Sequence, residues 1–468
     1  MEKGQDFKNK KIIIMGLGLN RGGLGVSLFL IKAGAKVLIT DLKTEKELAP
    51  SLKLLKGQPV QYILGQHRQK DFRKADLIIK NPGVPNNSPY LAIAKKYGIP
   101  VETDLGIFLR FCPSSKIIGV AGTKGKSTTA SLIYHLFKLA GQDVVLAGNI
   151  GISVFDSLAF IKKETIVVLE ISSWQLEGLK QHRFAPQTAV LTNVLPDHLD
   201  RYRNFSDYSQ AEQLIYKYQT SNHFLVFNQE QKKDYQGLKK AKANLFSFSQ
   251  KQKVKRGCFI EKGSVVCQIN SNKKRIIKTS AIPLLGNHNL SNVLAASAVA
   301  LIYDLPKDKI KEAIQSFKPP KHRLEFVREV RGIKFYNDSA ATTPEACLAA
   351  IHSFRQPIIL ILGGGNKKMS FESLVKEIKK TEIIKKIILL EHPNYSASVE
   401  IMELAKKLGI IDRFQSVAKI KEAVGTAFDL AQKEEIVLLS PAATSFGLFV
   451  NEFDRGHQFI KAVQGLKL

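Results

Sequence analysis

Short apolar runs alternate with segments of helical periodicity along most of the chain. The runs at 11–15, 36–41 and 75–80 are typical of buried strands, and further series begin at 117 and at 333. Between them, apolar residues recur at three- and four-residue spacing, as on one face of a helix. Strands that alternate with helices predict an α/β fold with mainly parallel sheets.

The segment IIGVAGTKGKSTT joins one strand-like run to a helical pattern. Gly122 and Gly125 allow backbone N–H groups to close around an anion at a helix N-terminus, Lys126 adds a cation, and the Ser127 hydroxyl suits Mg²⁺. Val120 stands where the Walker A pattern has its first glycine, so the motif is one position short of that pattern. We interpret the turn as a cradle for the phosphates of ATP; a strand, turn and helix without a ligand is the alternative.

Polar side chains end the next two strand-like runs. Glu170 closes the run TIVVLE, and Asn193, Asp197 and His198 follow the run AVLT. A carboxylate one strand away from a phosphate cradle is a usual Mg²⁺ ligand. A histidine beside an aspartate at a strand end favours a metal or phosphate role. The alternatives are that Glu170 caps the next helix and that Asp197 and His198 form a surface pair.

The N-terminal turn GLGLNRGG indicates a Rossmann-type opening. Gly16 and Gly18 fit a dinucleotide-binding turn, and Asp41 ends the next strand, where a carboxylate can accept a ribose hydroxyl. Asn20 and Arg21 interrupt the dinucleotide pattern, so a purely structural turn stays open. Further on, the sequence NPGVP presents backbone at the carboxyl edge of the same sheet.

Two breaks divide the 468 residues into three predicted domains. The sequence CPSS interrupts the pattern near residue 112, and the two prolines of FKPPKHRLE cannot continue a helix. We predict a Rossmann-like N-terminal domain at 1–112, a central P-loop ATPase-type domain at 113–317 and a Rossmann-like C-terminal domain at 318–468. The polar stretch at 228–278, with its short β-like runs, is expected to be a β-rich excursion of the central domain.

A long apolar helix is predicted for the segment GNHNLSNVLAASAVALIYDL. Asn289 or Ser291 is expected to cap its start, because asparagine and serine side chains accept hydrogen bonds from the first N–H groups of a helix. Side chains at such a start are also placed to reach a base or a ribose. Both roles stay open.

The charge balance and the cysteines narrow the classes of protein. A net charge of +29 is compatible with nucleic-acid binding, but the lysine-rich part at 232–278 lacks interleaved aromatic residues, so we expect a solvated basic surface that favours anionic substrates.

No apolar run has the length of a membrane span, which predicts a cytoplasmic protein without membrane contact. The four cysteines show no metal-site spacing and are expected to be reduced and mostly buried.

Nine motifs in order carry a family resemblance: GTKGKST, GNIG, LEISSWQL, NVLPDHLDRY, GNHNLSN, KHRLE, YNDSAATTPEA, LGGGNKK and SPAATSFGLF. Together they resemble the Mur ligases, the ATP-dependent amino-acid ligases of peptidoglycan precursor synthesis. The N-terminal turn and the segment SPAATSF are most similar to the member that adds D-glutamate to UDP-N-acetylmuramoyl-L-alanine through an acyl phosphate. The resemblance implies ATP and Mg²⁺, two ions, as cofactors, with the UDP-sugar and glutamate as substrates of a monomeric enzyme.

The resemblance also implies site residues. The catalytic residues are expected to be Lys126, Asn149 and His198. The ATP-binding residues are expected to be Gly122, Thr123, Lys124, Gly125, Lys126, Ser127, Thr128, Asn289, Asn292, Arg323 and Asp338. The Mg²⁺ ligands are expected to be Ser127, Glu170, His198 and Glu212. The UDP-substrate is expected at Gly16, Leu17, Gly18, Asp41, Asn81 and Gly83, and the amino acid at Thr342, Lys367 and Ser445.

The chain departs from the family pattern at four positions. Glu212 stands where members carry a lysine modified to a carbamate, so an unmodified carboxylate is expected to serve Mg²⁺ there. Ala340 replaces a lysine of the NDSKAT pattern and removes one cation. Gly447 and Glu452 replace an acidic and an aromatic residue near the amino-acid site. These two changes leave the identity and chirality of the added amino acid open.

Other functions fit parts of the sequence. A related ligase could add L-glutamate or another amino acid, or act on folate, although the folate enzyme lacks a Rossmann-type first domain. A dehydrogenase fused to an ATP-binding module would need a regular GxGxxG turn after Met15. A non-catalytic nucleotide-gated or nucleic-acid-binding protein would have no use for Lys126, Glu170 and His198 together.

Overall fold

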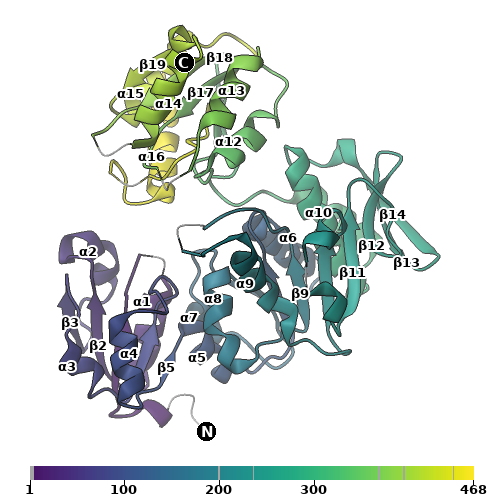
Figure 1. The fold of residues 1–468 in the computed structure, drawn as a ribbon. Helices are drawn as coiled ribbons and strands as arrows, with labels where there is room; N and C mark the ends of the chain where they lie inside the picture. The colour runs from purple at the N-terminus through teal and green to yellow at the C-terminus, as the bar shows by residue number, and fades with distance from the viewer. Residues whose placement is uncertain are drawn as a thin grey trace. The chain divides into compact units, whose positions relative to one another are not determined.

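The chain is seen in a computed structural model, which describes residues 5–19, 21–198, 201–235, 237–366, 369–393, 396–445 and 447–467. It divides into two compact units, one of Met1–Ile282 with Ser291–Phe317 and one of Pro283–Leu290 with Lys318–Leu468. The first unit contains two sheets and the second contains one (Figure 1). The expected α/β class with mainly parallel sheets is confirmed, while the domain boundaries at 112 and 317 stay predictions.

The N-terminal sheet has five parallel strands in the order β3-β2-β1-β4-β5. Its strands are β1 (Lys11–Met15), β2 (Lys36–Asp41), β3 (Val60–Leu64), β4 (Leu77–Lys80) and β5 (Val101–Glu102). Its helices are α1 (Gly22–Lys32), α2 (Glu45–Leu54), α3 (Gln69–Phe72), α4 (Pro89–Lys96) and α5 (Asp104–Phe111). Because side chains alternate along a strand, Ile12 and Ile14 pack with α1 and α5 on one face, while Ile13 and Met15 pack with α3 and α4 on the other. The strand order reverses between β1 and β4, and ligands of open α/β sheets bind at such a point.

The central sheet has nine strands in the order β14-β13-β12-β11-β10-β9-β6-β8-β7. Its strands are β6 (Ile117–Ala121), β7 (Val144–Gly148), β8 (Ile166–Glu170), β9 (Thr188–Leu191), β10 (Phe224–Asn228), β11 (Asn244–Ser249), β12 (Arg256–Glu261), β13 (Ser264–Ile269) and β14 (Asn272–Lys278). Its helices are α6 (Lys126–Leu139), α7 (Val154–Leu158), α8 (Ser173–Gly178), α9 (Phe205–Lys217), α10 (Asn287–Ile302) and α11 (Lys307–Ser316). The predicted β-rich excursion is confirmed as the antiparallel extension β12 to β14 of this sheet.

Helices cover both faces of the central sheet. Side chains of α5, α7, α8 and α9 share one core with alternate residues of the strands, among them Val167 and Leu169 of β8. Helix α6 packs against β7 and β8, and α11 packs against α6. The parallel strands β6, β8 and β9 are buried along their whole length, as expected for a sheet with two covered faces.

The third sheet, in the second unit, has the order β15-β16-β20-β17-β18-β19. Its strands are β15 (Glu325–Val330), β16 (Ile333–Asn337), β17 (Ile358–Leu362), β18 (Ile384–Leu390), β19 (Phe414–Val417) and β20 (Ile436–Leu439). Its helices are α12 (Pro344–Ile351), α13 (Glu372–Lys380), α14 (Ser396–Lys407), α15 (Ile420–Leu430) and α16 (Glu452–Gln464). Helices α12, α13 and α14 cover one face, and α15 and α16 cover the other. The order β19-β18-β17-β20 is that of a Rossmann half, with β16 in the place of the next strand.

The cysteines differ from expectation at one pair. Cys258 and Cys267 lie opposite each other in the antiparallel ladder of β12 and β13 and form a buried disulfide, so the prediction that all four are reduced is wrong. Their separation of nine residues matches no metal motif, and only the hairpin register brings them together. Cys347 is buried and Cys112 half-buried, as expected.

Candidate nucleotide site

The carboxyl edge of the central sheet collects most of the predicted nucleotide residues. Val120 of β6 lies opposite Glu170 of β8, which in turn lies opposite Gly148 of β7. Asn149 therefore follows its strand beside Glu170, and the glycine turn after β6 begins at the same edge. The loop after β9 completes the edge on the other side, because β9 is the second neighbour of β6. The predicted juxtaposition of these segments is confirmed.

The turn between β6 and α6, residues 122–125, is called the phosphate loop here. Gly122 has φ 122° and Gly125 has φ 85°, conformations that other residues rarely adopt. A Cβ atom at Gly122 would lie 2.6 Å from the carbonyl oxygen of Asn193, and one at Gly125 would overlap the side chain of Asn292. Glycine is therefore required at both positions by conformation and by space.

The loop after β9 fixes the phosphate loop through several hydrogen bonds. The N–H groups of Thr123 and Lys124 donate to the backbone oxygen and to Oδ1 of Asn193, at 2.8 and 2.9 Å. The hydroxyl of Thr192 donates to the carbonyl oxygen of Lys124 at 2.8 Å. The Lys124 ammonium also donates to Asp197 Oδ2 at 2.9 Å. Asn193 and Asp197 thus support the loop, and Lys124 is neutralised by an acidic neighbour.

Lys126 begins α6, and its side chain folds back over the loop. Its Nζ donates to the carbonyl oxygens of Gly122 and Thr123, at 2.6 and 3.0 Å. Ser127 and Thr128 lie in the first turn of the same helix and are buried. The first N–H groups of a helix have no partner within it and carry a partial positive charge. A cation, hydroxyl groups and a helix N-terminus therefore converge where the sequence places the phosphates.

Glu170 is a buried carboxylate with one unsatisfied oxygen. Its side chain is 2% exposed, and Oε1 accepts a hydrogen bond from Asn149 Nδ2 at 3.1 Å. Oε2 is buried and has no hydrogen-bond donor among the described residues. Ser172, and not Glu170, caps helix α8, so the capping alternative is wrong. A buried carboxylate oxygen without a donor is costly unless a cation meets it, so the residue fits a Mg²⁺ ion.

The described part of the chain contains no group of three or more His, Cys, Asp and Glu residues that could hold a metal ion.

His198 stands beside the phosphate loop in a left-handed conformation, with φ 54°. Its ring lies against Trp174 and Tyr208, with centroid distances of 5.1 and 6.0 Å. The hydroxyl of Tyr208 donates to Glu212 Oε1 at 2.9 Å. The structure thus brings His198 and Glu212 to the same side of the loop, with the tyrosine ring between them.

Glu212 lies on α9 and is 1% exposed. Burial raises its pKa, while the charge of Lys126 and the hydrogen bonds from Tyr208 and Gly122 act in the opposite direction. Burial also raises the pKa of Tyr208, which keeps this hydroxyl protonated as a donor. The sequence interpretation had no role for Tyr208, although its spacing of four residues from Glu212 places both on one helix face.

The N-terminal turn lies at the point where the order of its sheet reverses. Gly16 follows β1 and Asn81 follows β4, and a Cβ atom at Gly16 would lie 2.9 Å from Asn81 Cβ. Asp41 Oδ2 accepts from the N–H of Gly18 at 3.1 Å, and Asn81 Oδ1 accepts from that of Gly83 at 2.9 Å. Leu17 is buried below the turn. The six residues predicted for the UDP-substrate therefore lie at the carboxyl ends of β1, β2 and β4.

In the second unit, the predicted residues gather at the carboxyl ends of the neighbouring strands β16 and β20. Asp338 follows β16 and accepts hydrogen bonds from the Leu324 N–H at 3.1 Å and from Ser440 Oγ, which follows β20, at 3.0 Å. Burial raises the pKa of Asp338 to about 7. Ser445 is buried in the same segment after β20, and Thr342 is half-buried in the turn before α12.

Three further predicted residues belong to this unit. Arg323 is exposed beside β15. Asn289 Nδ2 donates to the carbonyl oxygen of Leu285 at 2.7 Å, inside helix α10, which begins at Asn287. The prediction that Asn289 or Ser291 caps this helix is therefore wrong. Lys367 lies outside the described residues. Asn292, in the first unit, accepts a hydrogen bond from Thr129 Oγ1 at 3.2 Å beside the phosphate loop.

Arg455 was missed by the sequence interpretation. This arginine of α16 is fully buried and donates to Ser339, at 3.0 Å to Oγ and at 2.9 Å to the carbonyl oxygen. It also donates to the carbonyl oxygen of Ala443 at 3.1 Å. Arg455 thus ties together the segments after β16 and β20 that carry Asp338 and Ser445. A local sequence pattern could not identify Arg455, because its partner Ser339 lies 116 positions away and its partner Ala443 lies in the segment after β20.

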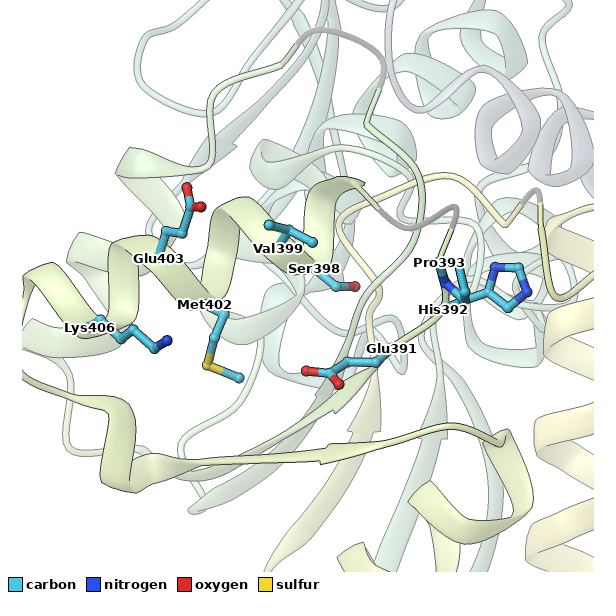
Figure 2. Close-up of a pocket in the computed structure, with 8 residues that line it drawn as sticks. All are labelled: Glu391, His392, Pro393, Ser398, Val399, Met402, Glu403 and Lys406. Carbon is cyan, nitrogen blue, oxygen red and sulfur yellow. The ribbon is translucent and has the colours of Figure 1, made fainter.

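A pocket of about 470 Å³ lies between the carboxyl end of β18 and helix α14 (Figure 2). Glu391 and Met402 point toward one another across it. Its lining residues are Glu391, His392, Pro393, Ser398, Val399, Met402, Glu403 and Lys406. Among the described residues, no predicted site residue lines this pocket. The site residues described above lie at the ends of other strands.

Family models match the chain in three consecutive parts. The Mur ligase MurD-like N-terminal domain matches residues 10–103, the Mur ligase middle domain matches residues 120–300, and the Mur ligase glutamate ligase domain matches residues 322–443. The chain belongs to the Mur ligase family. Its three-domain organisation is that of the family, and the phosphate loop lies in the middle domain.

Full-length relatives share this assignment. The chain is 37% identical over 467 residues to the UDP-N-acetylmuramoylalanine–D-glutamate ligase of Roseiflexus sp., covering 97% of this chain and 98% of that protein. It is 38% identical to the ligase of the same name from Borreliella afzelii, covering 98% and 99%. The corresponding ligase of Caldanaerobacter subterraneus is 35% identical, covering 99% and 100%.

Solved structures share the fold. UDP-N-acetylmuramate-alanine ligase MurC from Thermotoga maritima has a TM-score of 0.65 at 19% identity, covering 98% of this chain and 100% of that chain. MurF ligase from Thermotoga maritima, in complex with ADP, has a TM-score of 0.58 at 16% identity, covering 92% and 95%. Within the described residues, no helix is both long and apolar enough for a membrane span. The chain is thus an ATP-dependent ligase of the Mur type by family and fold.

Proposed function

We propose that this ligase adds D-glutamate to UDP-N-acetylmuramoyl-L-alanine, with cleavage of ATP to ADP and phosphate. One observation carries the proposal: the phosphate loop, Lys126 and the unsatisfied Glu170 oxygen meet at one sheet edge in a chain that aligns from end to end with D-glutamate ligases. The phosphate site supports the ATP-dependent step, and the full-length likeness supports the choice of substrates.

The reaction has two steps. The alanine carboxylate attacks the γ-phosphorus of ATP, so that an acyl phosphate forms and ADP leaves. The amine of D-glutamate then attacks the acyl carbon, an amide bond forms, phosphate leaves and the amine loses a proton. Both steps bring anions together, so positioning and neutralisation of charge are the main requirements on the protein.

The residues of the first unit meet these requirements in our proposal. Lys126 leaves the carbonyl oxygens of its own loop and contacts the transferred phosphoryl group, and the N-terminus of α6 binds the neighbouring phosphates. Glu170 and Ser127 hold Mg²⁺, which neutralises phosphate charge when bound. Asn149, oriented by Glu170, contacts the acyl group, and His198 would hold a second Mg²⁺ ion.

The remaining predicted residues complete the proposal. Thr123, Lys124, Gly125, Thr128 and Asn292 shape the ATP site. The ATP roles predicted for Asn289, Arg323 and Asp338 stay predictions. The carboxyl edge of the N-terminal sheet, with Gly16, Leu17, Gly18, Asp41, Asn81 and Gly83, takes the UDP part of the substrate. Thr342, Lys367 and Ser445 bind glutamate, because hydroxyl groups and a cation match its carboxylates.

Phosphate release from ATP and Mg²⁺ with UDP-N-acetylmuramoyl-L-alanine tests the proposal. We expect release that depends on D-glutamate, and little release with L-glutamate or without an amino acid. The Lys126→Ala variant is the control for contaminating ATPase activity. Release with L-glutamate alone would replace the proposed amino acid by the alternative and keep the ligase chemistry. No release with either would contradict the proposed substrates.

The proposal also covers the oligomeric state, the cellular location and the basic surface of the enzyme. We propose a monomer that works in the cytoplasm, where ATP is made, and whose basic surface attracts anionic substrates rather than nucleic acid. Size-exclusion chromatography with light scattering tests the oligomeric state. A KM for the UDP-substrate that rises steeply with salt supports attraction by the basic surface.

A further inference from the structure

Glu212 reaches the phosphate loop directly from helix α9. Its Oε2 accepts a hydrogen bond from the backbone N–H of Gly122 at 2.8 Å, and its Oε1 accepts one from the hydroxyl of Tyr208 at 2.9 Å. The side chain is 1% exposed, so water does not compete for these bonds. Both carboxylate oxygens therefore have protein donors.

Tyr208 extends this contact to the second residue of the loop. The oxygen of its hydroxyl also lies within hydrogen-bond distance of Thr123 Oγ1, at 2.9 Å, and the same Oγ1 accepts from the N–H of Leu195 at 2.9 Å. Two residues on one face of α9 thus hold Gly122 and Thr123 at once. A hydrogen bond from a backbone N–H to a carboxylate is among the stronger ones in proteins.

A cation belongs to the same network as Glu212. Burial raises the pKa of Glu212, and the charge of Lys126, which donates to the carbonyl oxygens of Gly122 and Thr123, opposes that rise. Glu212 therefore accepts from an N–H group of the loop, while Lys126 donates to carbonyl oxygens of the same loop. This geometry suits a support for the loop, and needs no metal ion between the groups.

We propose that Glu212 is a positioning residue that holds the phosphate loop in its binding conformation through the Gly122 N–H and through Tyr208. This inference rests on the proposed use of the loop for ATP, and it assigns Glu212 a role other than the Mg²⁺ ligation expected from the family resemblance. A Mg²⁺ ligand acts only when the ion is present, whereas a support of the loop acts on nucleotide binding with or without it.

Calorimetric titration with ADP separates the two roles, carried out once with MgCl₂ and once with EDTA. Glu212→Gln keeps an oxygen for the Gly122 N–H and an amide donor for the Tyr208 oxygen, so we expect an ADP affinity within about threefold of wild type in both conditions. Glu212→Ala removes both contacts and is expected to weaken ADP binding about tenfold or more, by the same factor with and without Mg²⁺.

Two tyrosines of α9 provide a matched control pair. Tyr208→Phe removes the hydroxyl that contacts Glu212 and Thr123, and is expected to weaken ADP binding a few-fold in both conditions. Tyr216→Phe removes an equally buried hydroxyl whose partner is Gln213, away from the loop, and is expected to leave ADP affinity unchanged. If Glu212→Ala does not fold, Glu212→Gln and the tyrosine pair still decide the question.

The role is overturned if Glu212→Ala or Glu212→Gln loses ADP affinity only in MgCl₂, which would make Glu212 a Mg²⁺ ligand. It is also overturned if Tyr208→Phe and Tyr216→Phe behave alike. Failure of the proposed function looks different. In that case, the ADP results hold as expected, but phosphate release shows no dependence on D-glutamate.

Discussion

Two glycine turns of the first unit invite comparison, because each joins a buried parallel strand to a helix. In the turn after β1, Asp41 accepts a hydrogen bond from the N–H of Gly18 at 3.1 Å. In the phosphate loop after β6, Glu212 accepts one from the N–H of Gly122 at 2.8 Å. Both turns thus use a buried carboxylate from a neighbouring element to satisfy a backbone donor.

The two turns differ in the bonding partner of the cation beside each of them. Within the described residues, the Lys126 ammonium donates to carbonyl oxygens of its own loop alone, so a phosphate can compete for it. Arg21, just before α1, forms an ion pair with Asp156 of α7 at 3.2 Å. Glycines thus supply the backbone shape in both turns. The partner of the neighbouring cation determines which turn can bind a triphosphate.

Removal of the two cations tests this difference most strongly. Lys126→Ala is expected to lower kcat/KM about a thousandfold, because a cation on the transferred phosphoryl group stabilises the transition state. Arg21→Ala is expected to change kcat/KM by less than about threefold, since an exposed ion pair contributes little. Steady-state phosphate release measures both variants. An equal loss in both would contradict the comparison.

Alanine at one glycine of each turn sharpens the comparison of backbone shapes. Gly122→Ala is expected to weaken ADP binding about a hundredfold, because the new Cβ atom meets the backbone of Asn193 at 2.6 Å and φ is 122°. Gly18→Ala meets only Asn81 Nδ2, at 3.3 Å, and is expected to leave ADP binding unchanged. Calorimetry with ADP measures the difference, and weak ADP binding by Gly18→Ala would show that the turns are coupled.

The Asp41→Ala variant tests whether the first turn binds a different substrate from the phosphate loop. Asp41→Ala frees the N–H groups of Gly18 and Lys43, and is expected to raise the KM for the UDP-substrate about tenfold with the KM for ATP unchanged. Asp76→Ala is the matched control, because Asp76 accepts the N–H of Lys11 at 2.7 Å at the amino edge of the same sheet. A change of both KM values in Asp41→Ala would argue against separate sites.

A pH effect of smaller size is expected beside the first turn. Lys80 ends β4 and donates to the Val84 carbonyl oxygen and to Asn86 Oδ1, and burial lowers its pKa to about 8. The folded protein then releases this proton near pH 8, while the unfolded chain keeps it to about pH 10. The unfolded chain binds more protons in that interval, so folding stability due to Lys80 rises with pH across it.

Melting temperatures of wild type and Lys80→Gln measure this effect. We expect the difference, wild type minus variant, to grow by a few degrees between pH 7.5 and pH 10. A difference that stays constant or shrinks over this range would contradict the lowered pKa.

The sequence predicted those parts of the fold and the site that depend on short stretches of chain. Buried runs marked the strands around Val120, Glu170 and Leu191, and the carboxyl ends of parallel strands share an edge, so the site could be located before its geometry was known. The glycines of the phosphate loop likewise predicted its backbone conformation from the sequence.

The remaining features depend on register and on distant partners. The pairing of Cys258 with Cys267 follows from the hairpin register, which no local pattern gives. The contacts of Arg455 with Ser339 span 116 positions, and those of Glu212 with Gly122 span 90. The likeness of Glu212 to a family metal ligand gave its position correctly, but not the two hydrogen bonds that occupy its oxygens.

The disulfide of the β12–β13 hairpin also bears on how the chain tolerates a change of redox environment. It closes a ring with a sequence separation of only nine, for which loop entropy gives a stabilisation of about 2–3 kcal/mol, and the ladder already holds the same residues together. Strand β12 lies four strands from β6, or about 19 Å at the usual spacing. Opening the bond to two thiols is therefore expected to leave the hairpin and the phosphate loop in place, so one fold can serve under oxidising and reducing conditions alike.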